Sequence, residues 1–104
     1  MLIVLDFDET FTRDPFLWHD FITLAKQRGH TIICATMRHE SEGEDVIRFL
    51  GDRVEKIIFT DRKAKRKAVY DAGYMPSVWI DDSPQFIDND ALPRVQIKKG
   101  LYDN

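Results

Sequence analysis

Two aspartates separated by one residue follow a short apolar run near the start of the printed sequence. The run is LIVL at residues 2–5, and Asp6, Asp8 and Thr10 come after it at alternate positions. One carboxylate of such a pair can attack phosphorus, while the second protonates the leaving oxygen and later deprotonates water. Neighbouring aspartates in different environments can divide these roles. The spacing therefore indicates phosphoryl chemistry at the end of a buried segment.

Two further apolar runs also end in polar residues. The run at 31–35 precedes Thr36 and Arg38, and the run at 77–80 precedes the acid pair at 81–82. Because ligands bind at the carboxyl ends of the strands in an α/β sheet, we expect these side chains to converge. Crowded carboxylates suit Mg²⁺, which prefers oxygen ligands. A Mg²⁺ ion with a nearby lysine neutralises the charge that builds up in phosphoryl transfer.

Strand and helix patterns alternate along the sequence with short connections. This order predicts right-handed crossovers, a parallel sheet and a three-layer α/β/α sandwich. We expect strands at 2–5, 30–35, 54–59, 77–80 and 94–97, with helices between them and a short helix from Ser83-Pro84.

Local signals predict where the helices begin. Asp14 is the expected N-cap of the first helix, which continues to about Gly29. The stretch SEGE at 41–44 is interpreted as a capping box for the second helix. Thr60 or Asp61 is expected to cap a third, basic helix. The apolar positions of the first helix are Leu17, Phe21 and Leu24 on one side, with Trp18, Ile22 and Ala25 beside them.

The composition is that of one small globular domain, which we place over residues 1–104. Hydrophobic residues make up 43% and charged residues 32% of the 104 residues, and the formal net charge is −3. This charge argues against a general nucleic-acid binder. The run RKAKRK at 62–67 nevertheless holds five of the fifteen basic residues, which predicts one local positive patch. The patch fits either a solvated helix face or a surface that guides a nucleic-acid strand.

The cysteine count and the hydropathy pattern exclude several further classes of protein. The single cysteine, Cys34, excludes an intramolecular disulfide and a cysteine-based zinc cluster, and its apolar surroundings predict a buried thiol. The sequence shows no basic leader and no apolar segment long enough to span a membrane. We therefore expect a cytoplasmic protein.

Each candidate also has an ordinary structural explanation. The acid pair at 81–82 could cap the helix expected at Ser83-Pro84, and Thr36 is a residue type common in strands. Any one lysine of the run at 62–67 is more often part of a solvated face. Their occurrence together, each at the end of a strand, favours a shared site.

Four segments in order make the sequence resemble the haloacid dehalogenase (HAD) superfamily of phosphohydrolases. They are LIVLDFDET, TIICAT, a lysine at a helix start and VWIDDSP, and they span residues 2–84. The endings TMR and DDSP are similar to capless members, such as the phosphatase domain of phage polynucleotide kinases and the carboxy-terminal-domain phosphatases. The resemblance implies a Rossmann-like sandwich with a five-stranded sheet of order 5-4-1-2-3 and no cap domain.

The resemblance also implies roles for the acidic residues. Asp6 would be the nucleophile and a Mg²⁺ ligand. Asp8 would be the general acid and base, and its backbone carbonyl would bind the metal. Asp82 would be a direct metal ligand, with Asp81 supporting it.

Further roles on the phosphate and substrate side follow from the same resemblance. Thr36 would hydrogen-bond the transferred phosphoryl group as part of the catalytic set. Thr10 would brace the loop beside the phosphate, and Arg38 would meet the substrate, as its counterpart does in some members.

The catalytic lysine is not fixed by the sequence. Lys63, Lys65 and Lys67 all lie near the start of the third helix. Lys65 fits the distance to Gly73 and the acid pair best, and Lys63 is the second choice, with a role in phosphate binding.

The sequence therefore predicts a Mg²⁺-dependent phosphomonoester hydrolase that acts through a phospho-aspartate on Asp6. A site without a cap suggests a large substrate, such as a phosphorylated nucleic-acid end or protein, or a partner chain that acts as a lid. Two alternatives remain open. One is a small-molecule phosphatase acting on nucleotides, and the other is a catalytically silent phosphate- or metal-binding partner module.

Overall fold

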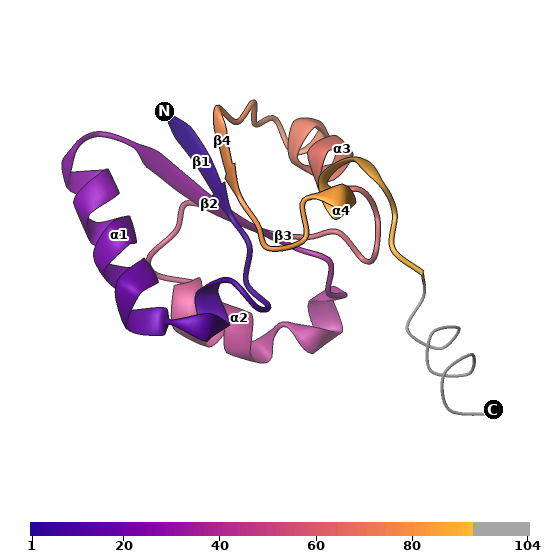
Figure 1. Cartoon of the computed structure of the whole chain (residues 1–104), viewed down its shortest axis with the longest axis horizontal. Helices are drawn as coiled ribbons and strands as arrows, with labels where there is room; N and C mark the ends of the chain where they lie inside the picture. Colours follow the sequence, from indigo (N-terminus) through magenta and orange to yellow (C-terminus); the bar gives the residue numbers. More distant parts are fainter. Residues whose placement is uncertain (93–104) are drawn as a thin grey trace.

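Four short parallel strands form the centre of the structure, a computed structural model that describes residues 1–92. They lie in the order β3-β2-β1-β4 (Figure 1). This α/β architecture with a parallel sheet is the predicted class, and the first four strands have the predicted order. The sheet has four strands rather than five, and the fifth strand predicted at 94–97 lies outside the described residues. The strands are β1 (Leu2–Leu5), β2 (Thr31–Thr36), β3 (Ile57–Phe59) and β4 (Val78–Ile80).

Helices cover both faces of the sheet. Figure 1 shows α1 and α2 on one side, and α3 with α4 on the other. The segment that connects β1 to β2 holds only a 3-10 turn and one helix, so the described chain has no inserted cap at this point. The helices are α1 (Pro15–Gln27), α2 (Glu44–Leu50), α3 (Lys65–Asp71) and α4 (Gln85–Asp88), with 3-10 turns η1 (Phe11–Arg13) and η2 (Glu40–Glu42).

Alternate residues of the central strands supply two separate cores. Leu5 of β1 packs in the cluster that contains Leu50 of α2, and Val4 packs with Val69 of α3. Successive strand residues point to opposite faces, so a run apolar at every position is buried on both sides. Each fully buried aliphatic side chain contributes about 1.5–3 kcal/mol relative to exposure. The continuous apolar runs therefore hold the strand ends in fixed positions.

The first helix begins where the sequence predicts, but its buried side differs. The Asp14 carboxylate accepts a hydrogen bond from the Leu17 amide at 3.1 Å, as expected of an N-cap. Ile22 and Ala25 are the buried residues of α1. Leu17 and Leu24 are 54% and 56% exposed. The helix is thus rotated towards the second of its two apolar rows.

The capping box predicted for α2 is wrong. The helix begins at Glu44, after Gly43, and no side chain caps it. Gly43 lies against the ring of Phe59, where a Cβ atom would collide with ring carbons. The capping box instead belongs to η2, in which the His39 amide donates to the Glu42 carboxylate at 2.8 Å.

The third helix starts later than predicted. Asp61 and Arg62 both have left-handed backbone conformations, with φ of 52° and 69°. Such residues cannot continue an α-helix, so α3 begins only at Lys65.

The burial of the cysteine and the question of a membrane-spanning segment can both be examined in the structure. Cys34 is fully buried, and this burial raises the pKa of its thiol far above the usual range. Among the helices described for residues 1–92, none has the length and apolarity needed to cross a membrane.

Candidate active site

The ends of β1 and β4 place three carboxylates side by side. The Asp6 amide donates to the Ile80 carbonyl at 2.9 Å, which extends the pairing of the two strands to the point where the acids begin. Carboxylate oxygens of Asp6, Asp81 and Asp82 all lie within 4.8 Å of one another. The convergence predicted for these residues is therefore present in the structure.

Lys65 at the start of α3 joins two of these carboxylates. Its Nζ donates to Asp6 at 2.8 Å and to Asp81 at 2.6 Å, and the lysine is only 2% exposed. By contrast, the side chains of Lys63 and Lys67 are 74% and 79% exposed. Their ammonium groups face Asp90 and Asp71, outside this cluster. Of the three candidate lysines, the structure places Lys65 in the site.

Burial and charge set the ionisation of this cluster. Burial raises the pKa of Asp6 to about 7, although the Lys65 ammonium acts to lower it. Burial would lower the pKa of Lys65, but the negative charge of Asp6 and the hydrogen bond to Asp81 raise it. Two carboxylates around one ammonium leave a surplus negative charge. A proton on Asp6 or a bound cation neutralises that surplus.

Thr10 connects the end of β1 to the loop after β4. Its hydroxyl lies 3.1 Å from an Asp6 oxygen and 3.2 Å from an Asp82 oxygen. It also accepts a hydrogen bond from the Asp82 amide at 3.2 Å. Burial acts to raise the pKa of Asp82, but hydrogen bonds from Asp6 and Thr10 hold it below the usual value. Thr10 thus braces the loop, and the two acids have opposite pKa shifts.

Asp8 points to a different partner from Asp6. Arg38, in the loop after β2, donates to its two carboxylate oxygens from Nε at 3.0 Å and Nη2 at 2.7 Å. The remaining guanidinium nitrogen, Nη1, donates to the Glu42 carbonyl at 2.8 Å and contacts Asp45. These contacts raise the pKa of Arg38. A bidentate pair of this kind fixes the direction of a carboxylate as well as its charge.

A cavity of about 190 Å³ opens in front of the carboxylates. Thr36 does not belong to its lining: the residue is fully buried, and its hydroxyl accepts from the Arg38 amide at 3.3 Å. Lys63 is not in the lining either. The lining consists of the predicted residues Asp6, Asp8, Lys65, Asp81 and Asp82, together with Glu9, Met37, Ser83, Phe86 and Ala91.

The second group of lining residues was missed by sequence reasoning. Glu9 and Ser83 are adjacent to predicted acids, so proximity in sequence is a signal that could have found them. Glu9 also has a left-handed φ of 64°, which a sequence does not reveal for a non-glycine residue. Met37, Phe86 and Ala91 carry no chemical signal, and only the fold brings them to the cavity.

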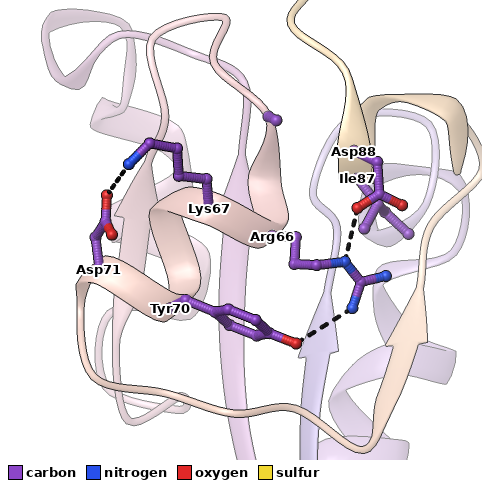
Figure 2. A pocket seen from close by; sticks show the side chains of 7 residues that line it. Arg66, Lys67, Tyr70, Asp71, Ile87 and Asp88 are labelled. Carbon is purple, nitrogen blue, oxygen red and sulfur yellow. Dashed lines mark hydrogen bonds and ion pairs between the residues drawn. The ribbon is translucent and has the colours of Figure 1, made fainter.

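Another hollow, of about 310 Å³, lies between α3 and α4 (Figure 2). Arg66 crosses it and donates to Asp88 at 2.7 Å and towards the Tyr70 hydroxyl at 3.4 Å. Lys67 bonds Asp71 at 2.9 Å. The charged side chains drawn in this view are thus engaged with one another, and the carboxylate cluster lies elsewhere.

The donor set at the sheet edge fits a hard divalent cation. Asp6, Asp81 and Asp82 supply carboxylate oxygens only, and ligands of this kind suit Mg²⁺ better than softer metals. The surplus negative charge of the buried cluster is a second reason for a cation to bind there.

The chain matches no family model, and no curated protein and no solved structure compared with it gives a match. The resemblance to the HAD superfamily therefore stays a prediction from four short motifs.

Proposed function

We propose that this protein is a Mg²⁺-dependent phosphomonoester hydrolase of the capless HAD type, with Asp6 as its nucleophile. The observation that carries the proposal is the buried Lys65 ammonium between Asp6 and Asp81, beside Asp82. Burying a lysine and two carboxylates costs desolvation free energy, so a buried ion pair is weak evidence of a role in stability. Such a cluster at a sheet edge therefore favours a functional role. Neutralising a phosphoryl group is a use that fits these residue types.

Asp6, Asp82 and the backbone carbonyl of Asp8 would hold the Mg²⁺ ion, with Asp81 in support. A bound Mg²⁺ ion would supply Lewis-acid stabilisation of the negative charge on the phosphoryl oxygens.

The chain's own residues divide the reaction into two displacements. An Asp6 carboxylate oxygen attacks phosphorus, the bond from phosphorus to the ester oxygen breaks, and Asp8 gives that oxygen a proton. Water then attacks the phosphorus of the aspartyl phosphate and gives a proton to Asp8. The bond between phosphorus and Asp6 breaks, which releases inorganic phosphate and restores both aspartates.

Two basic residues keep the acids in place for these steps. Lys65 holds one Asp6 oxygen through a 2.8 Å hydrogen bond and carries a positive charge next to the transferred group. Arg38 donates to both oxygens of Asp8 and holds it as a carboxylate, so its proposed role is to orient Asp8 before substrate binds. This pair opens before Asp8 takes up the proton that it gives to the ester oxygen. Thr36, which lies beneath this loop, would support Arg38 through the backbone.

The test is phosphate release from an aryl phosphate, nucleotides, a phosphopeptide and phosphorylated oligonucleotides, each with Mg²⁺ and with EDTA. We expect Mg²⁺-dependent release that Asp6→Asn reduces by at least about a thousandfold, since covalent catalysis requires the carboxylate. Asp20→Asn, at an exposed position of α1, is the matched control and should keep wild-type rates.

Equal rates for Asp6→Asn and Asp20→Asn would eliminate the phospho-aspartate mechanism. Failure of the wild-type protein on the whole panel, with Mg²⁺ binding intact, would instead support a silent metal-binding module.

A further inference from the structure

The basic run at 62–67 is neutralised by its own surroundings. Figure 2 shows this for Arg66 and Lys67, whose side chains end on carboxylates of α4 and α3. A protein that binds a nucleic-acid backbone needs basic groups that can contact successive phosphates. The pairs in this run are Arg62–Glu42, Lys63–Asp90, Lys65 with Asp6 and Asp81, Arg66–Asp88 and Lys67–Asp71.

The cavity carries a net negative charge. Five carboxylates line it, against one ammonium group from Lys65. Three of these carboxylates are exposed, those of Asp8, Glu9 and Asp82, and the side chains of Asp8 and Glu9 are 50% and 62% exposed. Arg13 and Arg38 neutralise Glu9 and Asp8, so the net negative charge of the cavity comes from Asp6, Asp81 and Asp82. Asp6, Asp81 and Asp82 against Lys65 leave two negative charges, which one divalent cation would balance, so no positive charge remains in this lining for a second anionic group.

Apolar surface completes the wall of the same cavity. Met37 comes from the loop after β2, Phe86 from α4 and Ala91 from the segment after α4. These side chains offer van der Waals contact and no hydrogen-bond donor to a second anionic group. A neutral or cationic substituent fits this wall and the net negative charge of the cavity better than an anionic one.

We propose that the site selects phosphomonoesters whose remaining part carries no further negative charge near the phosphoryl group. This inference rests on the phosphohydrolase function proposed above and narrows its substrate class. It favours a phosphorylated side chain within a neutral or lysine-rich peptide, and it disfavours a phosphorylated nucleic-acid end. The sequence run that suggested a nucleic-acid surface is the run whose charges are paired in the structure.

The experiment compares kcat/KM for phosphoserine peptides that differ only in their flanking residues, which are lysine, alanine or glutamate. An aryl phosphate and 3′- and 5′-phosphorylated oligonucleotides complete the set, all with Mg²⁺ at low salt. We expect the lysine-flanked peptide to exceed the glutamate-flanked peptide by about tenfold or more, because like charges within a few ångströms repel strongly at low salt. The oligonucleotides should rank with the glutamate-flanked peptide.

Equal or faster turnover of the glutamate-flanked peptide or the oligonucleotides would overturn the charge preference. Hydrolysis of the aryl phosphate would in that case still support the phosphohydrolase. No hydrolysis of any compound would overturn both proposals.

A pair of variants separates rim charge from other causes of selectivity. Glu9→Gln removes one carboxylate from the mouth, so the lysine-to-glutamate ratio should fall about twofold to fivefold. Glu55→Gln removes an exposed carboxylate just before β3, at the opposite end of the strands, and should leave the ratio unchanged. Equal ratios in the two variants would show that rim charge does not set the preference.

Discussion

Replacing Asp6 with asparagine should stabilise the metal-free protein, and the gain should depend on pH. Burial raises the pKa of Asp6 from 3.8 to about 7, so the folded carboxyl keeps its proton to a higher pH than the unfolded chain does. Between these two pH values the folded state binds more protons, and its free energy of unfolding therefore falls as pH rises. Asparagine has no proton to lose and avoids this loss.

The size of the effect follows from the same pKa. The full difference corresponds to about 4 kcal/mol, at about 1.36 kcal/mol per pH unit. Relaxation around the charged form reduces it, so we expect the advantage of Asp6→Asn to grow by about 2–3 kcal/mol between pH 4 and pH 8. Lys65 does not enter this range, because its own pKa is raised from 10.5. In the variant its Nζ still has Asp81 at 2.6 Å.

The assay is urea unfolding in EDTA at several pH values, followed by the fluorescence of Trp18 and Trp79. Asp20→Asn is the control, since that carboxyl is exposed. If the gain in free energy of unfolding from Asp6→Asn stays constant with pH, or shrinks as pH rises, the claim that burial raises the pKa of Asp6 is refuted. Saturating Mg²⁺ should then stabilise the wild type and leave Asp6→Asn nearly unchanged, because only the wild type keeps the full set of ligands.

Two further predictions concern the same cluster. The apparent affinity for Mg²⁺ should rise about tenfold per pH unit up to about pH 7, because the ion must displace the proton of Asp6. Calorimetric titration at pH 6 and pH 7.5 measures this affinity. Equal affinities at the two pH values would contradict the prediction. Lys65→Met should destabilise the metal-free protein by about 3–5 kcal/mol, because it leaves buried carboxylates without their cation. Lys63→Met and Lys67→Met alter exposed side chains and should cost about 0.5 kcal/mol or less in the same urea titrations. Similar losses of unfolding free energy in all three lysine variants would show that the buried contacts of Lys65 stabilise the protein no more than exposed ion pairs do.

The position of the acidic residues at the sheet edge could be predicted from the sequence, because short strands that are apolar throughout are easy to recognise. A run such as LIVL is buried on both faces, so its last residue marks the sheet edge, and Asp6 follows directly. The same reasoning placed the pair at 81–82. The order of the first four strands could be predicted only through the resemblance, since strand pairing depends on contacts between distant residues.

The choice among three lysines depended on backbone details that the sequence does not display. The left-handed residues Asp61 and Arg62 delay α3, so that Lys65 rather than Lys63 stands at its first turn. Neither residue is a glycine, and nothing in their types signals that conformation. The pairing of Arg38 with Asp8 was equally hidden, because it requires the loops after β1 and β2 to meet in space.

The position of β1 between β2 and β4 also determines when the site can form during synthesis and folding. Leu2 pairs with Thr31, a partner that is made soon after it, but Ile3 also pairs with Val78, which emerges much later. A nascent chain can thus present Asp6 and Asp8 on a partial sheet while the acids after β4 are still missing. Contacts of such long sequence separation slow folding. The carboxylate cluster is consequently among the last features to assemble, and a cation that binds it favours the fully paired sheet over any partly folded form.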